Sequence, residues 1–401
     1  MRRYRWVILG AGTFAQATFS SMTVGLPALA PVLRSYYHLS LGRTGIALGA
    51  ASLGMLFTLL PWGLLADRIG ERAVMTTGLA GGGLALLALS LTHSFGALVG
   101  LLALSGALGA SINAASGRAV IGWFAADQRG LALGIRQTAV PIGGAVAAAV
   151  LPWLASGGKP GHAFLGLGAA LLCGSVVAAA LVREPPVHDG PALVDLARPV
   201  RELRSWLLAG GSAFFVIAQI ALTSYAVLFL HQHRGLSTDH AALTLAAMNV
   251  LGIGTRIGTG RWSDRLRARI RPLRILGTAI TVATAAVALL VDAPLPVLVP
   301  AIAIAGAISL SWNGLAFTAA AETAGMARSG AALGFQQTVL GVYVSIGVPA
   351  FAALAAATSW RVAFAGSALF PLLGVLVLLR VPEVTADART RGTTAIPPSA
   401  R

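Results

Sequence analysis

The chain has 401 residues, of which 56% are hydrophobic and only 10% are charged, and its mean hydropathy is +0.80. This composition excludes an ordinary soluble domain and is typical of a protein that lies in a lipid bilayer. The formal net charge of +16 would suggest a nucleic-acid partner for a soluble protein. The single cysteine, Cys173, excludes a disulfide framework and a thiolate metal site.

Apolar stretches of about 20 residues, the length that a helix needs to cross the hydrocarbon core, occur twelve times. The first is too long for a signal peptide and lacks a small-residue cleavage site, so we interpret it as a permanent helix. The sequence thus predicts an all-α membrane protein with twelve transmembrane helices. The predicted spans cover residues 6–30, 44–66, 73–92, 97–124, 131–155, 162–183, 205–231, 240–262, 273–291, 296–321, 331–356 and 360–381.

The second half of the chain repeats the first. Residues 39–68 resemble residues 236–265, and the segment GLALGIRQT at 130–138 returns as GAALGFQQT at 330–338. Such a repeat is typical of a secondary transporter whose substrate site lies at the midplane between two symmetry-related halves. We therefore expect two pseudo-symmetric six-helix bundles. The predicted divisions are an N-terminal bundle at 1–183, a cytoplasmic linker at 184–204 with a short amphipathic end, a C-terminal bundle at 205–381 and a disordered cytoplasmic tail at 382–401.

The basic residues have a one-sided distribution along these spans. If the N-terminus is cytoplasmic, 21 of the 29 arginines and lysines fall inside and only Arg34, Arg43, Lys159, Arg234 and Arg361 fall outside. The positive-inside rule then places both termini in the cytoplasm and explains most of the net charge as topology. We expect a multi-pass protein of the plasma (inner) membrane whose partners are the lipid bilayer and a small-molecule substrate. Nucleic acid is not an expected partner, and a monomer is the expected state.

The loop after the second span carries Gly63, Asp67, Arg68, Gly70 and Arg72 in one motif. This motif resembles the G-x-x-x-D-R-x-G-x-R signature of the major facilitator superfamily. The second half holds a degenerate copy at Gly260, Asp264, Arg265 and Arg269. The resemblance covers about residues 5 to 381 and implies two six-helix bundles that rock about a central cavity, giving alternating access.

The two aspartates of these loops have a physical role that does not depend on the resemblance. Asp67 ends span 2, where we expect the start of span 11 near Ser329 and Gly330. A helix N-terminus carries about half a positive charge, so a carboxylate there gains about 0.3 to 2 kcal/mol. Asp264 is expected to make the same contact with span 5 near Gly130. Both contacts exist only while the cytoplasmic side is closed, so they favour the outward-facing state.

Three arginines lie within predicted spans: Arg118, Arg136 and Arg256. An arginine at a helix centre costs about 2.5 to 3.5 kcal/mol, so each must pair, snorkel or face a cavity. Of the 13 acidic residues only Glu322 is expected inside the membrane, so we expect too few carboxylates to pair the arginines. Surplus positive charge favours an anionic substrate whose carboxylate binds a guanidinium. The alternative is that the arginines bond to backbone carbonyls at a gate or interface.

Other polar residues on the predicted spans are candidate substrate ligands, although buried amides also serve as contacts between helices. They are Gln16, Asn113, Tyr225 and Asn313 on spans 1, 4, 7 and 10, and Gln137, Gln336 and Gln337 on spans 5 and 11. Glu322 is a candidate coupling or gate residue, and the gate or an arginine partner is the role we favour because it lies near the end of its span.

Two segments resemble monocarboxylate porters. They are the turn from Trp123 through Arg129 to Gly143, and Arg256-x-x-x-Gly260, whose arginine contacts substrate in that family. Gly252 stands where those porters have an acid. Oxalate:formate exchangers pair the span 8 arginine with a span 11 lysine, where this chain has Gln336 and Gln337. The resemblance implies a small carboxylate moved by exchange or by proton-linked symport.

Proton-coupled efflux of drugs or metabolites is the alternative function. Residues 140–144 (VPIGG) resemble part of the antiporter motif G-P-x-x-G-G, with valine in place of its first glycine, and Leu102 stands where that motif expects an arginine. Small-residue packing around a proline kink also explains the segment. The sequence holds no phosphate-binding loop, nucleophile triad or metal-ligand constellation. We therefore expect a carrier without enzyme activity, cofactor or metal, driven by an ion or substrate gradient.

Overall fold

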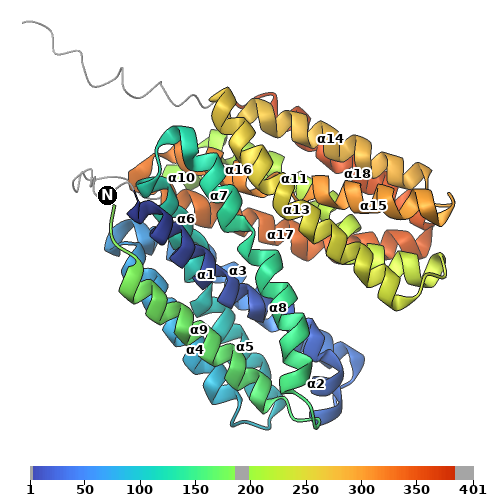
Figure 1. The fold of residues 1–401 in the computed structure, drawn as a ribbon, viewed down its shortest axis with the longest axis horizontal. Coiled ribbons are helices and arrows are strands. Elements are labelled where there is room, and N and C mark those ends of the chain that lie inside the picture. The colour runs from blue at the N-terminus through green and yellow to red at the C-terminus, as the bar shows by residue number, and fades with distance from the viewer. Residues whose placement is uncertain (1–2, 186–197, 384–401) are drawn as a thin grey trace, which may run out of the picture.

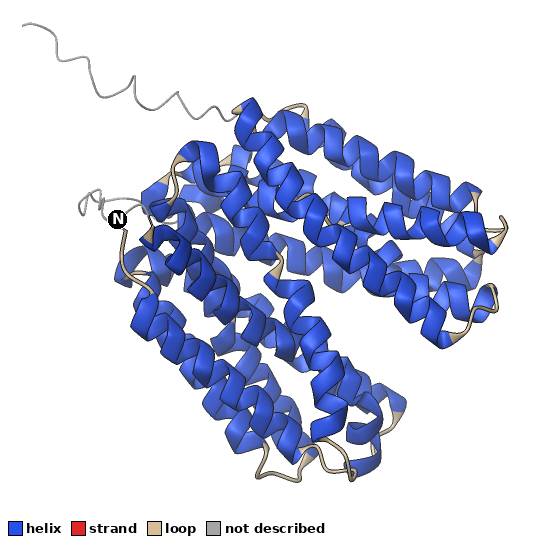
Figure 2. Ribbon diagram, in the orientation of Figure 1, coloured by secondary structure: helices blue, strands red, loops and turns tan. Residues whose placement is uncertain are grey.

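The computed structural model describes residues 3–185 and 198–383, and every regular element in these ranges is helical (Figure 2). Twelve helical stretches in the described part are long and apolar enough to cross a membrane. The predicted all-α fold with twelve spans is thus confirmed. The first stretch is longer than predicted and runs from Tyr4 to Tyr36, because a 3-10 turn at Leu26–Leu29 continues it into a further short helix.

The helices of the two halves follow the same order along the chain. The N-terminal half contains α1 (Tyr4–Gly25), η1 (Leu26–Leu29), α2 (Ala30–Tyr36), α3 (Leu41–Ile69), α4 (Glu71–Leu89), α5 (Phe95–Gly109), α6 (Ser111–Trp123), η2 (Ala126–Gln128), α7 (Arg129–Gln137), α8 (Ala139–Leu154) and α9 (Gly161–Leu181). The C-terminal half contains α10 (Arg198–Arg201), α11 (Leu203–Ser224), α12 (Ala226–Leu228), η3 (Phe229–His233), α13 (Thr238–Leu266), α14 (Ile270–Leu289), α15 (Leu295–Ser309), α16 (Asn313–Ala324), η4 (Met326–Arg328), α17 (Ser329–Ala357) and α18 (Trp360–Leu378).

The helices form two bundles that meet at one end of the molecule and diverge toward the other, so that the ribbon has the outline of a V (Figure 1). The joined end carries the described N-terminal residues and the start of α10. Contacts between the bundles run along α3 with α17 and along α7 with α13, which are symmetry-related pairs. The joined end is therefore the closed side of the molecule in this state, and we call it the closed end.

Polar contacts repeat between the halves and show why equivalent residues form equivalent helices. Ser40 caps α3 by accepting from the Arg43 N–H, and Ser237 caps α13 in the same way, which satisfies an amide that the helix itself leaves free. Inside the bundles, the Thr58 hydroxyl donates to the Ala107 carbonyl (2.8 Å), and Thr255 donates to Ala307 (2.9 Å). The sequence repeat is thus also a repeat of tertiary contacts.

Four of the twelve spans are interrupted in their middle part. Spans 4, 5 and 7 break at Ala110, Thr138 and Tyr225, and span 10 breaks at residues 310–312. A break frees backbone carbonyls within the membrane, and these must then find donors from side chains. Interrupted helices near the midplane are also where carriers bind their substrates.

The outer face of the bundles carries large apolar side chains, such as Leu53, Phe57 and Leu84, which are more than half exposed. This surface is suited to contact with lipid rather than water. Residues 186–197 of the predicted linker lie outside the described residues. Its predicted amphipathic end is helical: α10 ends at Arg201 and α11 begins at Leu203.

The predicted tail needs one correction. The Glu383 carboxylate accepts from the backbone N–H groups of Arg269 (2.6 Å), Ile270 (2.7 Å) and Arg271 (2.8 Å), so it caps the start of α14. The expectation that disorder starts at Pro382 is therefore wrong for the first two residues, because Glu383 gains the amides of a helix N-terminus. Residues 384–401 lie outside the described residues.

Candidate functional site

Arg136 lies at the end of α7 and is almost completely buried, with 1% of its surface exposed. Its Nε donates to the Ser116 hydroxyl (2.7 Å) and its Nη1 to Gln137 Oε1 (2.7 Å). Its Nη2 donates to Gln16 Oε1 (3.2 Å) and to the Asn113 carbonyl (2.6 Å). All three nitrogens therefore have neutral acceptors, and the positive charge is hydrogen-bonded but not neutralised.

Arg256 reaches from α13 across the boundary between the bundles. Its Nη1 donates to the Gln137 carbonyl at the break in span 5 (2.6 Å), and its Nε donates to the Leu310 carbonyl at the break in span 10 (2.8 Å). This is the carbonyl-bonded interface arrangement that the sequence left open as an alternative for Arg256. The third nitrogen, Nη2, makes no hydrogen bond with a described residue. It is not one of the fully buried side-chain atoms that lack a hydrogen-bond partner.

Arg136 and Arg256 form one positively charged centre. Gln137 bonds to both, through its side chain to Arg136 and through its carbonyl to Arg256. Neither guanidinium is in an ion pair within the described part of the chain. Two buried cations without a carboxylate leave the region short of negative charge, which a bound anion would supply.

The other predicted ligands divide between this centre and more distant contacts. Gln16 and Asn113 belong to the centre, since Gln16 Nε2 donates to Asn113 Oδ1 (3.1 Å). Gln336, the symmetry mate of Arg136, is buried and donates to the Ser212 hydroxyl (2.6 Å). The three remaining candidates take other places. Gln337 is half-buried, Asn313 has a buried Oδ1 without a hydrogen-bond partner, and the Tyr225 hydroxyl donates to the Val348 carbonyl (2.6 Å).

Arg118 does not belong to the centre. Its Nε donates to Asp67 Oδ1 (2.8 Å) and its Nη1 donates to Glu71 Oε1. The expectation that the interior arginines lack carboxylate partners is therefore wrong for Arg118. The reason is that Asp67 and Glu71, assigned to a loop edge from the sequence, lie within membrane-spanning helices and have fully buried side chains.

Asp67 joins the two bundles at the closed end, and we call its contact the N-clamp. Its Oδ1 accepts from the Gly330 N–H (2.9 Å) and its Oδ2 from the Ala331 N–H (2.7 Å), at the start of α17. This is the contact predicted from the sequence. Arg118 holds the carboxylate in place from α6. Arg68 and Arg72 of the same motif are exposed.

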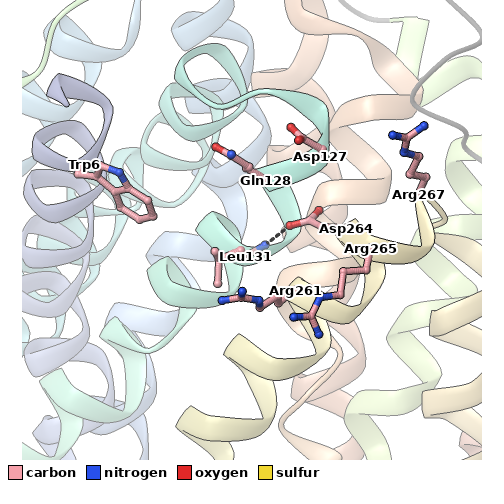
Figure 3. A pocket seen from close by; sticks show the side chains of 8 residues that line it. All are labelled: Trp6, Asp127, Gln128, Leu131, Arg261, Asp264, Arg265 and Arg267. Atoms are coloured by element: carbon pink, nitrogen blue, oxygen red, sulfur yellow. Dashed lines mark hydrogen bonds between the residues drawn. The ribbon is translucent and has the colours of Figure 1, made fainter. Parts of the chain in front are cut away.

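Asp264 makes the symmetry-related contact, the C-clamp. Its Oδ1 accepts from the Gly130 N–H (3.0 Å) and its Oδ2 from the Leu131 N–H (2.8 Å) at the start of α7, and Figure 3 shows Asp264 pointing at Leu131. The predicted contact with span 5 is thus present. A pocket of about 430 Å³ lies beside it, between the bundles. Its wall residues, labelled in Figure 3, include Trp6, Asp127 and Gln128 from one half and Arg261, Arg265 and Arg267 from the other.

Arg269 organises the C-clamp. Its Nη1 donates to Asp264 (2.7 Å), and its Nε and Nη2 donate to the two oxygens of Glu322 (3.0 and 3.1 Å). Arg129 Nη1 lies 3.7 Å from Glu322 Oε1. Burial by itself lowers the pKa of Arg269, but the hydrogen bond and charge of Glu322, with those of Asp264, outweigh it and raise the pKa. Glu322 is therefore an arginine partner at the closed end.

Glycine makes the close approach at both clamps possible. A Cβ added to Gly63 would lie 2.2 Å from the Gly330 carbonyl oxygen, and one added to Gly260 would lie 2.2 Å from the Gly130 oxygen. Backbone atoms cannot rotate away from such a contact. The closed end therefore requires glycine at these positions.

Comparison with known proteins agrees with this geometry. The sequence profile of the Major Facilitator Superfamily matches residues 9–347. The chain belongs to the Major Facilitator Superfamily. An uncharacterized MFS-type transporter of Mycobacterium tuberculosis, Rv2994, is 33% identical over 96% of this chain and 88% of its own length.

Solved structures of the superfamily show the same fold. The proton:xylose symporter XylE, bound to 6-bromo-6-deoxy-D-glucose, superposes with a TM-score of 0.76 at 17% identity, covering 96% of this chain and 97% of its own. The human organic anion transporter MFSD10 superposes with a TM-score of 0.72 at 16% identity, covering 93% and 99%. The chain is thus a multi-pass membrane carrier of small molecules and not an enzyme.

Several residues of these networks were not found from the sequence. Ser116 accepts from Arg136, Ser212 accepts from Gln336, and Glu71 pairs with Arg118 beside the N-clamp. The repeat held a usable signal for Ser212. Gln16 and Ser212 lie at equivalent places in the two halves, and they contact the symmetry-related residues Arg136 and Gln336. Glu71 had no such signal, since loop-edge charges are common in all membrane proteins, whereas Arg269 is the last arginine of the degenerate loop motif.

Proposed function

We propose that the chain carries a small organic anion, recognised through a carboxylate, across the plasma membrane by alternating access. The observation that supports this most is the centre formed by Arg136 and Arg256 around Gln137. Both arginines are buried, and neither has a carboxylate partner among the described residues.

The uncompensated charge of the two arginines favours one class of substrate. Taking a charge out of water costs several kcal/mol unless a partner compensates it, and here neutral acceptors give only partial compensation. A carboxylate would offer two oxygens to the one nitrogen, Arg256 Nη2, that lacks an acceptor within the described residues. A cationic substrate would add to the uncompensated charge, so this centre favours an anion over the cations typical of drug efflux.

The proposal includes a topology and a mode of coupling. We place the closed end and both termini in the cytoplasm, which makes this state outward-facing, and we take the monomer as the transporting unit. Glu322 is paired with Arg269, so it is not free to carry a proton through the substrate path. We therefore expect exchange of one anion for another, or symport in which the proton arrives on the substrate.

Uptake into proteoliposomes tests the substrate class. A panel of labelled mono- and dicarboxylates would be offered with and without a pH gradient, and each acid would be compared with its methyl ester. The acids should be transported or compete and the esters should not, because an ester supplies no charge to the arginines. Competition by ethidium with none by any carboxylate would overturn the proposal and favour proton-coupled efflux.

Arginine variants test the site itself. Arg136→Gln and Arg256→Gln should each reduce anion counterflow at least tenfold, because a neutral side chain leaves the substrate charge unpaired in a medium of low dielectric constant. Arg361→Gln is the matched control, since Arg361 is half exposed and pairs with Asp292 far from the centre. Counterflow that survives in both site variants would show that these arginines hold the bundles together rather than bind substrate.

A further inference from the structure

Two acidic side chains lie together at the start of α4, and neither takes part in the contacts between the bundles. Glu71 is the first residue of α4 and is completely buried. Glu184 follows the end of α9 and turns back onto the same place. Its Oε1 lies 2.2 Å from where a Cβ would stand on Gly70, so it occupies the room that this glycine leaves free. Gly70 also has a φ of +85°, which suits a residue without a side chain.

The hydrogen bonding of this pair is incomplete unless a proton is added. Glu71 Oε1 accepts from Arg118, but Glu71 Oε2 and Glu184 Oε2 are both buried and have no hydrogen-bond partner among the described residues. Glu184 Oε1 lies against Gly70, the residue before Glu71, so the two carboxyl groups are close neighbours. An ionised carboxylate only accepts hydrogen bonds, so two of them cannot bond to one another. A single proton between them supplies the missing donor and satisfies both groups.

The charges around the pair lead to the same conclusion. Arg118 is the cation in contact with it, and Arg118 divides its nitrogens between Glu71 and Asp67. Asp67 is further compensated by the two amides at the start of α17, which do not reach Glu71. Arg68 and Arg72, on the adjoining loop, are exposed and form no ion pair with a described residue. Three carboxyl groups thus face one guanidinium, and one added proton removes the excess of negative charge.

We infer that the acidic pair beside the N-clamp is a proton-binding site, in which one proton is held between Glu71 and Glu184 while the bundles are joined at the closed end. The inference does not depend on the identity of the transported substrate. Arg118 connects the pair to Asp67, and Asp67 is bound to α17 only in this state. When α17 leaves, water reaches the cluster and hydrates its carboxyl groups, and the pair ionises and releases its proton to the same side of the membrane.

The sign of the resulting pH dependence follows from linkage. The closed state binds one proton more than the open state, so acid on the side of the clamp favours closure and alkali favours opening. For one linked proton the equilibrium constant between the two states changes by at most tenfold per pH unit, within the range where the pair titrates in only one of them.

Distance measurements between spin labels would test this in nanodiscs, where both faces have the same pH. Labels at Thr77→Cys in α4 and Thr278→Cys in α14 would report the separation of the bundles, because both threonines are exposed and bond only within their own helices. The exposed Cys173 would be replaced by serine. The fraction of molecules open at this end should rise with pH in the otherwise unmodified chain.

Variants of the pair decide between a proton site and a structural contact. Glu184→Gln and Glu71→Gln each replace the shared proton with an amide donor, so both should remain closed at all pH values and lose the pH slope. Glu383→Gln is the matched control: Glu383 occupies the equivalent place in the C-terminal half but is satisfied by three backbone amides, so its variant should keep the slope. A pH slope that persists in both pair variants, or no slope in the unmodified chain, would overturn the inference.

Infrared difference spectra give a second readout that does not depend on the labels. The closed protein should show the carbonyl stretch of a protonated carboxyl group, and Glu184→Gln should remove it while Glu383→Gln should not. A spectrum without that band at a pH where the distance data show a closed molecule would also contradict the proposal.

Discussion

In the N-terminal half, Asp67 shares Arg118 with Glu71, and a further carboxyl group, Glu184, lies against the pair. At the C-clamp, Asp264 shares Arg269 with Glu322, and Arg129 of the N-terminal half lies against Glu322. The contacts between bundles are the same, but the group beside the shared arginine and its two acids is acidic at the N-clamp and basic at the C-clamp. Equal geometry therefore does not mean equal electrostatics.

The difference separates the two clamps by their response to pH. The raised pKa of Arg269 means that its stabilising charge is fully present below its ordinary pKa and is lost only at higher pH, so Arg269 stays charged near neutrality. The N-clamp, by contrast, needs a proton to balance its acids. On the inference above, the acids beside the N-clamp respond to pH, whereas the arginine of the C-clamp stays charged.

The largest expected effect comes from neutralising the aspartate that each clamp contains. Asp67→Asn and Asp264→Asn each exchange a carboxylate at a helix N-terminus for an amide and leave an arginine with one partner fewer, so each should shift the population toward opening by about tenfold or more. Transport should slow, while equilibrium substrate affinity stays within a few-fold once the shift is allowed for. Cysteine accessibility on either face measures the shift, and unchanged accessibility in both variants would show that the clamps do not hold this end closed.

A second effect tests the backbone contact in each half. Gly63→Ala and Gly260→Ala place a methyl group 2.2 Å from a carbonyl oxygen of the partner bundle, an overlap that costs about 1–3 kcal/mol in the closed state. We expect similar shifts toward opening in the two variants, whatever the pH. Gly49→Ala in α3 and Gly258→Ala in α13 are the controls, because nothing lies within 4 Å of a Cβ at either position. Effects of the same size in the controls would indicate a general loss of helix packing.

Neutralising Glu322, the second acid that Arg269 binds at the C-clamp, should have a smaller effect. Glu322→Gln leaves Arg269 paired with Asp264, so anion counterflow should be retained with at most a several-fold loss, and the pH slope of the unmodified chain should persist. Counterflow and spin-label distances measure the two parts of this prediction. Counterflow abolished by Glu322→Gln but intact in Arg136→Gln and Arg256→Gln would instead indicate a proton-coupled carrier of neutral or cationic substrates.

The smallest expected effect concerns the paired threonines. Thr58→Val and Thr255→Val remove equivalent hydrogen bonds to Ala107 and Ala307, each worth about 0.5–1.5 kcal/mol of stability. Thr255→Val should cost more, because the Trp62 indole also donates to the Ala107 carbonyl (2.7 Å) and keeps it satisfied. Thermal unfolding in detergent would rank the two, and an equal or reversed order would contradict this account.

The sequence by itself determined the twelve spans, the repeat of the two halves and the contacts of Asp67 and Asp264 with the partner bundle. These features follow from local properties: the length of apolar segments, the position of a carboxylate at a helix end and the equivalence of repeated segments. Bundle boundaries, membrane side and substrate remain predictions.

Only the tertiary structure decided where the interior charges find their partners. Arg118 meets Glu71 because α4 begins inside the bundle, and Arg256 meets the Gln137 and Leu310 carbonyls because spans 5 and 10 break there. Glu184 reaches Glu71 because the chain turns back after α9. Helix breaks and long-range contacts depend on how the bundles pack, and electrostatic pairing acts over a few ångströms in space rather than along the chain. Residue spacing therefore located the charges, and packing determined what each of them binds.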